Sequence, residues 1–177
     1  MIARINAKAE KALREAMGHV AHAEADQIEP SLAALDEIER AEAFGLAIMV
    51  ACYVMIDACG TQWPTDASVR RIAHGLATIG TTAERLHLDS EQIYRYLSRV
   101  VLGTETIEDV VPDEPMFTRL PVIVAQRAAV VYSPKEMSTW EYLDQIESAI
   151  EVALALDVTV LPAAVMRAYL PKPEAKA

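Results

Sequence analysis

The apolar residues of this chain recur mostly at the spacing of one helical face. The N-terminal segment shows this spacing at Ile2, Ile5, Ala9, Leu13, Met17 and Val20. Charged residues fill the positions between them, so the pattern predicts a surface helix that buries one stripe.

Residues 30–59 contain a stretch that is apolar on every side. Pro30 and Ser31 are typical of a helix start, and no charged residue occurs between Ala43 and Ile56. A helix without a polar face must be covered all round by protein or by lipid. A membrane span needs roughly 20 apolar residues, and extending this stretch that far takes in Asp57. We therefore predict the central core helix of a bundle, with a membrane span as the less favoured alternative.

Capping residues predict three further helices, over residues 65–79, 81–88 and 89–102. Thr65 and Asp66 have side chains that can cap the first of these helices. The other two begin with capping boxes, in which each side chain satisfies the other residue's backbone amide: Thr81 with Glu84, and Asp89 with Gln92.

The chain between Gly103 and Pro115 reads as an acidic connector, and the element after it has two interpretations. We expect this element to start at Pro115 or Pro121. Residues 122–132 are rich in β-branched side chains, which favour a strand. We nevertheless predict a helix there, with the strand as the alternative.

Ser133, Pro134 and Glu136 form the strongest helix-start pattern in the chain. Serine caps a helix, proline suits the first helical position and glutamate suits the third. We predict a helix from this point to about Leu156 and a last short helix over residues 158–170. Residues 171–177 are predicted to form a mobile tail.

These elements predict an all-α fold, a compact bundle of about six to eight helices around the central helix at about 30–59. A chain of 177 residues fits one hydrophobic core, so residues 1–170 are expected to form a single helical domain. The composition agrees, since 53% of the residues are hydrophobic and only 6% are aromatic, as suits closely packed helices.

The net charge of −10 disfavours general attraction to nucleic acid or to anionic membranes. The N-terminal segment lacks the apolar core of a signal peptide. Cys52 and Cys59 are separated by about 10 Å along one predicted helix, too far for a disulfide between them. These features predict a cytoplasmic protein with two reduced thiols.

Residues 79–100 follow the spacing of two helices joined by a turn at His87 to Asp89. Small and apolar residues occupy the positions expected to be buried between these helices: Ala83, Leu86, Leu88, Ile93 and Leu97. In these positions the segment resembles the helix-turn-helix of LuxR-type regulators and of sigma-factor region four. The resemblance implies that four residues face the major groove, Ser90, Glu91, Tyr94 and Arg95, with Arg85 and Arg99 near phosphates.

Two observations favour a simpler interpretation of this segment. His87 stands where the motif usually has glycine. Residues 66–103 carry five Arg against four acidic residues, a balance of only +1, whereas phosphate contacts supply most of the non-specific affinity for DNA. An ordinary corner between two packed helices is therefore the favoured interpretation.

The sequence predicts no catalytic, cofactor-binding or metal-binding residue. His19 and His22, near Glu15 and Asp26, are expected to be solvated on the first helix. Glu84 with His87 forms a Glu-x-x-His pair that occurs once, whereas a di-metal bundle needs two. Asp57 would have a raised pKa if it were buried, but we expect it to mark the point where the apolar helix reaches water.

We predict a non-enzymatic protein that acts through protein–protein association, as a self-associating chain or a small adaptor or regulatory subunit. Residues 43–56, 120–132 and 149–170 offer more apolar helical surface than one monomer is expected to cover. One alternative is a DNA-binding regulator that uses residues 79–100. Another is a bundle that holds an apolar ligand beside Met49, Tyr53 and Met55.

Overall fold

The computed structural model describes residues 4–60, 64–78, 89–102 and 114–155, with side chains in the last range at 119–152, 154 and 155. These residues form helices and no strand. The elements are α1 (Ala7–Ala21), the short 3-10 helix η1 (Ala25–Gln27), α2 (Ile28–Ala33), α3 (Glu37–Ala58), α4 (Asp66–Thr78), α6 (Ser90–Leu97), the π-helical turn η2 (Ser98–Leu102), α7 (Glu114–Tyr132) and α8 (Thr139–Ala155). The predicted all-α bundle is confirmed.

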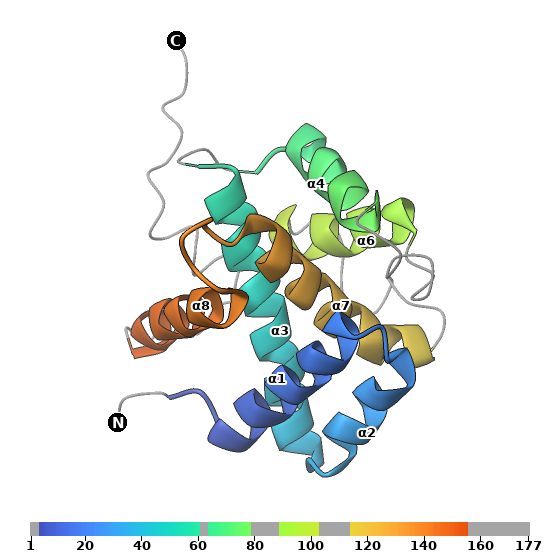
Figure 1. The fold of residues 1–177 in the computed structure, drawn as a ribbon, viewed down its shortest axis with the longest axis vertical. Coiled ribbons are helices and arrows are strands. Elements are labelled where there is room, and N and C mark those ends of the chain that lie inside the picture. The colour runs from blue at the N-terminus through green and yellow to red at the C-terminus, as the bar shows by residue number, and fades with distance from the viewer. Residues whose placement is uncertain (1–3, 61–63, 79–88, 103–113, 156–177) are drawn as a thin grey trace.

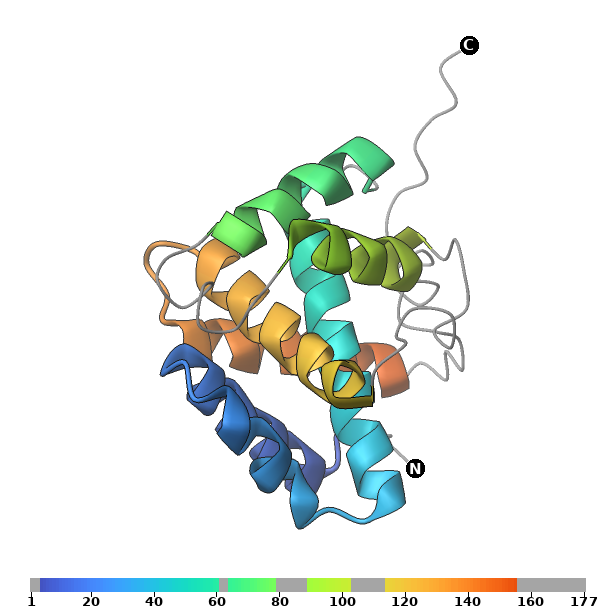
Figure 2. The ribbon, with the colours of Figure 1, turned by 90° about the vertical axis from the view of Figure 1, so that its right-hand side faces the viewer.

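Two central helices, α3 and α7, pack along each other and organise the bundle (Figure 1). Helices α1 and α2 cover one end of this pair, while α4 and α6 lie side by side at the other end (Figure 2). Helix α8 packs against the side of α3 and α7. Buried apolar residues from all these helices form one continuous core.

The predicted central helix is confirmed, but its predicted start at Pro30 is wrong. Pro30 and Ser31 belong to the separate short helix α2. Helix α3 begins at Glu37 because Asp36 caps it: the Asp36 carboxylate accepts a hydrogen bond from the Glu39 amide at 2.8 Å, and the Glu39 carboxylate accepts one from the Asp36 amide at 3.2 Å. Because Asp36 has an extended backbone, the chain is not helical there, and α2 and α3 are separate helices.

Residues 43–56 of α3 are all buried or half-buried, as an all-apolar helix requires. Among the described helices, α3 is long and apolar enough to cross a membrane by length and composition. Here α1, α7, α8 and η2 pack against it. These are the surroundings of a core helix within a bundle.

Helix α7 resolves the choice between helix and strand in favour of the helix. Residues 120–129 are all buried, so β-branched side chains are accommodated by contacts on every side rather than by local propensity. Of the two predicted starts, Pro115 agrees with the structure, because the helix begins at Glu114; Pro121 is wrong, because the helix passes through it. Pro121 lacks an amide hydrogen, and its place inside the helix costs one backbone hydrogen bond.

Helix α8 starts five residues later than its strongest sequence pattern predicts. The predicted start at Ser133 and Pro134 is wrong, because these residues lie in the connection after α7. The helix begins at Thr139, where Ser138 and Glu141 form the capping box: the Glu141 amide donates to Ser138 Oγ at 3.2 Å, and the Ser138 amide donates to Glu141 Oε2 at 2.8 Å. Two Ser-x-x-Glu patterns thus lie between α7 and the start of α8, and the fold uses the second.

The remaining predictions fall partly within the described residues. Helix α1 buries the predicted stripe from Ala9 to Val20, and Thr65 Oγ1 caps α4 by accepting from the Ser68 amide at 3.3 Å. The predicted helix from Asp89 to Leu102 is present, with its last turn π-helical. The predicted helix at 81–88, the connector at 103–113, the helix at 158–170 and the tail at 171–177 lie outside the described residues.

Candidate functional site

The α4–α6 face holds the residues for which the sequence suggested DNA contacts. Asp89 caps α6 by accepting from the Glu91 amide at 3.0 Å, which fixes the direction in which α6 starts. Glu91 and Arg95 are exposed, whereas Ser90, Tyr94 and Arg99 are half-buried. Arg85 lies outside the described residues.

Tyr94 turns toward α4 rather than outward. Its hydroxyl donates to the Asp66 carboxylate, and the Arg70 guanidinium lies 3.8 Å from the centre of its ring. The hydrogen bond from Tyr94, followed by the contact with Arg70, lowers the pKa of Asp66 although partial desolvation opposes the shift. Tyr94 therefore joins α6 to α4, and only part of its ring faces solvent.

Two exposed arginines of the α4–α6 face, Arg70 and Arg95, lie beside carboxylates. Arg70 Nε lies 3.2 Å from Asp66 Oδ2, and Arg95 Nε lies 3.1 Å from Glu91 Oε1. Arg70 Nη1 also lies 3.9 Å from a Glu91 oxygen. The face is exposed, but its positive and negative charges are balanced, unlike the basic surface that phosphate contacts need.

A second candidate surface lies on the first half of α3. Ile38 is 72% exposed, Ala41 is exposed, and Gly45, Ile48 and Met49 are half-buried. Their helical spacing places these five residues on one side of α3, which we call the open face. A Cβ added at Gly45 would meet no atom of a neighbouring element within 4 Å, so none of the described elements packs closely on the middle of this face.

The sequence interpretation expected surplus apolar surface at residues 43–56 but did not locate the open face, which begins at Ile38. The available signal was Ile38, an apolar residue among the acidic first turns and in helical register with Gly45 and Met49. Other large apolar residues are exposed singly elsewhere: Val130, Trp140 and Val152. Single exposed apolar residues are common on protein surfaces, whereas the open face groups several.

The two histidines of α1 contact groups near the C-terminal end of that helix. His19 Nδ1 lies 2.7 Å from Glu24 Oε2, and His22 Nδ1 lies 2.8 Å from the Gly18 carbonyl oxygen. A carbonyl oxygen only accepts, so His22 Nδ1 is the donor. Within the described ranges, no three His, Cys, Asp or Glu side chains are grouped to hold a metal ion; Glu84 and His87 lie outside those ranges.

Asp57 lies where α3 reaches water, as the sequence interpretation expected, because its side chain is exposed. Its Oδ2 accepts a hydrogen bond from the buried Tyr142 hydroxyl at 2.6 Å. Burial, together with this hydrogen bond to Asp57, raises the pKa of Tyr142. The contact joins the C-terminal end of α3 to the first turns of α8.

The residues suggested for an apolar ligand do not share one side of α3. Met49 and Tyr53 are half-buried and four residues apart, so they lie on one side. Met55 is completely buried on another side, in the core.

No protein-family model, no curated protein and no solved structure matches this chain. Its function is therefore argued from its own residues.

Proposed function

We propose that this protein acts by binding protein, and that it does so first by associating with a second copy of itself through the open face of α3. The observation that carries the proposal is Ile38, which is 72% exposed at one end of this face. Apolar area removed from water contributes about 25 cal/mol per Å², so covering the face stabilises a complex.

Gly45 supports a helix as the element that covers the open face. It has no side chain, and the space beside it is open, so the backbone of another helix can approach closely there. In a twofold dimer the same face of each copy covers the other. The open face alone is therefore sufficient to form such a dimer.

Charge sets the conditions in which this association is expected. Each copy has a net charge of −10, so two copies repel each other at low ionic strength. Salt screens this repulsion and leaves the apolar contact intact. Self-association is therefore expected to strengthen with salt, the opposite of what ion pairing between copies would give.

Sedimentation over a wide concentration range tests the proposal. The expected result is a monomer–dimer equilibrium that Ile38→Lys and Gly45→Arg each weaken, because both place a charge on the open face. The matched control is Val152→Lys, since Val152 is 61% exposed on α8 and lies outside this face. A chain that stays monomeric at high concentration and high salt, with all three variants folded, would sink the proposal.

DNA binding through the α4–α6 face has less support. The exposure of Arg95 favours it, but the carboxylates of Asp66 and Glu91 lie next to the exposed guanidinium groups. Titration of duplex DNA at several salt concentrations separates the two functions. Binding that weakens steeply with salt, and weakens further in Arg95→Ala and Arg99→Ala, would replace self-association as the favoured function.

A further inference from the structure

Helix α8 is attached to the bundle along one stripe. The helix packs against α3 and α7, and the residues of this stripe are buried: Tyr142, Leu143, Ile146, Glu147 and Ile150. The opposite side of the helix is exposed, as is most of the connection from Ser133 to Ser138. One member of the stripe, Glu147, carries a carboxylate among apolar neighbours.

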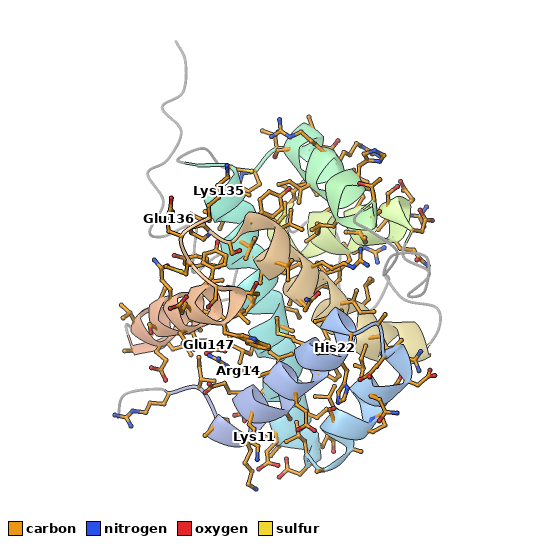
Figure 3. The ribbon with its side chains drawn as sticks, in the orientation of Figure 1. Lys11, Arg14, His22, Lys135, Glu136 and Glu147 are labelled. Carbon is orange, nitrogen blue, oxygen red and sulfur yellow. The ribbon has the colours of Figure 1, made fainter. Side chains whose placement is uncertain are left out.

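Polar side chains join α8 to α1, and Arg14 is at their centre. Its guanidinium lies 2.5 Å from Asp144 Oδ1 and 3.3 Å from Glu10 Oε1. It also donates to both carboxylate oxygens of Glu147, from Nε at 3.3 Å and from Nη2. Figure 3 shows Arg14 and Glu147 pointing toward each other across the gap between α1 and α8.

The charge of Glu147 depends on this contact. Glu147 is 8% exposed, and a buried carboxylate is tolerated when it is paired and hydrogen-bonded. Burial raises the pKa of Glu147 more than Arg14 lowers it, and the nearby carboxylates Glu10 and Asp144 add to the rise. The pair therefore only partly offsets the cost of burying the ionised group.

We propose that α8 is a releasable cover on the α1–α3–α7 body, with Arg14 as its lock. While Arg14 holds Glu147, α8 stays docked. When the pair is lost, the buried carboxylate favours release, and α8 leaves as a unit while α1, α3 and α7 stay folded. Release exposes the apolar stripe of α8 and the side of α3 beneath it.

The direction of the pH effect follows from the shift of Glu147. Its docked pKa lies above its value in the released helix, so the docked state binds the proton more tightly, and docking weakens as the pH rises through that pKa. Among the described residues, the other ionisable groups at the contacts of α8 include Glu10 and Arg14 from α1, Tyr53 and Asp57 from α3, and Asp144, Tyr142 and Glu151 of α8 itself. The cover is therefore held more firmly in mild acid than at neutral pH.

Hydrogen exchange of the whole protein, read peptide by peptide, tests the proposal. At neutral pH, Arg14→Met is expected to speed exchange of residues 139–155 by at least about tenfold, with little change in α3 and α7. Mild acid, after correction for intrinsic rates, or the double variant Arg14→Met with Glu147→Gln, restores protection. The matched control is Lys11→Met on the exposed side of α1.

Two results would overturn the proposal. Exchange that rises equally in α3, α7 and α8 of Arg14→Met means that α8 belongs to the same cooperative unit, and unchanged exchange means that Arg14 is not the lock. If Arg14→Met does not fold, Glu147→Gln alone decides: it is expected to slow exchange in α8 relative to the natural protein, and equal or faster exchange contradicts the releasable cover.

Discussion

At the scale of single residues, two buried tyrosine hydroxyls have opposite surroundings. Tyr142 donates to Asp57 at 2.6 Å, whereas the Tyr96 hydroxyl is fully buried and has no hydrogen-bond partner among the described residues. Burial raises the pKa of Tyr96 well above its usual range, so the hydroxyl stays neutral. An unpartnered buried hydroxyl costs about 1–3 kcal/mol.

Tyr96→Phe is therefore expected to leave the free energy of unfolding unchanged or to raise it by up to about 1 kcal/mol, since it removes a desolvated group. The matched variant Tyr142→Phe removes a hydrogen bond to a carboxylate and is expected to lower stability by about 1–2 kcal/mol. Denaturant unfolding followed by circular dichroism measures both. A clear loss of stability in Tyr96→Phe would mean that the hydroxyl has a partner, such as a bound water.

Two glycines should respond to alanine in opposite directions. Gly45 lies inside α3 with open space beside it, so Gly45→Ala is expected to stabilise the protein by about 0.5–1 kcal/mol through helix propensity. Gly60 follows the end of α3 with a φ of +66°, which alanine adopts at a cost of about 1 kcal/mol. Thermal unfolding measures the stability of both variants. Stabilisation by Gly60→Ala as well as by Gly45→Ala would contradict the left-handed turn at Gly60.

At the scale of the elements, capping decides where helices start. Ser138→Ala removes the hydroxyl that accepts from the Glu141 amide and is expected to cost about 1 kcal/mol. Ser133→Ala is the control, because Ser133 Oγ makes only a 3.4 Å contact with the Val130 carbonyl, and a change within about 0.5 kcal/mol is expected. Urea unfolding measures the free energy of unfolding of both variants. A larger loss of stability in Ser133→Ala than in Ser138→Ala would contradict the observed start of α8.

At the scale of the whole molecule, Cys52 reports on opening of the core. It is completely buried in α3, with its Sγ 3.8 Å from the Val100 carbonyl oxygen of η2. Burial raises the pKa of its thiol to about 12, and thiolate is the reactive form. The core is one continuous cluster, so exposure of Cys52 requires a large part of it to open.

A Cys59→Ser variant, which keeps only Cys52, is therefore expected to react with a thiol reagent far more slowly than its unfolded form. The logarithm of the rate should fall in proportion to the free energy of unfolding measured with denaturant. Labelling that is fast in the folded protein would show that η2 opens locally while the rest of the core stays packed.

The sequence by itself determined the helices and the central place of α3. These features depend on residues that are three or four positions apart in the chain. They can be recognised in the sequence as the apolar stripe of α1, the uncharged stretch of α3 and the capping residues Thr65 and Asp89. Local hydrogen bonds and one-sided burial act over the same short distances. That is why the all-α fold could be predicted without the structure.

Only the tertiary structure decided between patterns that are locally equivalent. Both Ser133 and Ser138 precede a glutamate by three residues, but α8 begins after Ser138, which forms the capping hydrogen bonds with Glu141. Residues 122–132 suit a strand or a helix, and burial on every side in α7 selects the helix.

The candidate sites depended on tertiary structure even more. The direction of Tyr94, the pairing of Arg14 with Glu147 and the exposure of Ile38 each depend on which helix lies next to which. These contacts join residues far apart in the chain. The spacing of residues along one helix carries no information about them, so the open face of α3 and the lock on α8 became visible only in the folded protein.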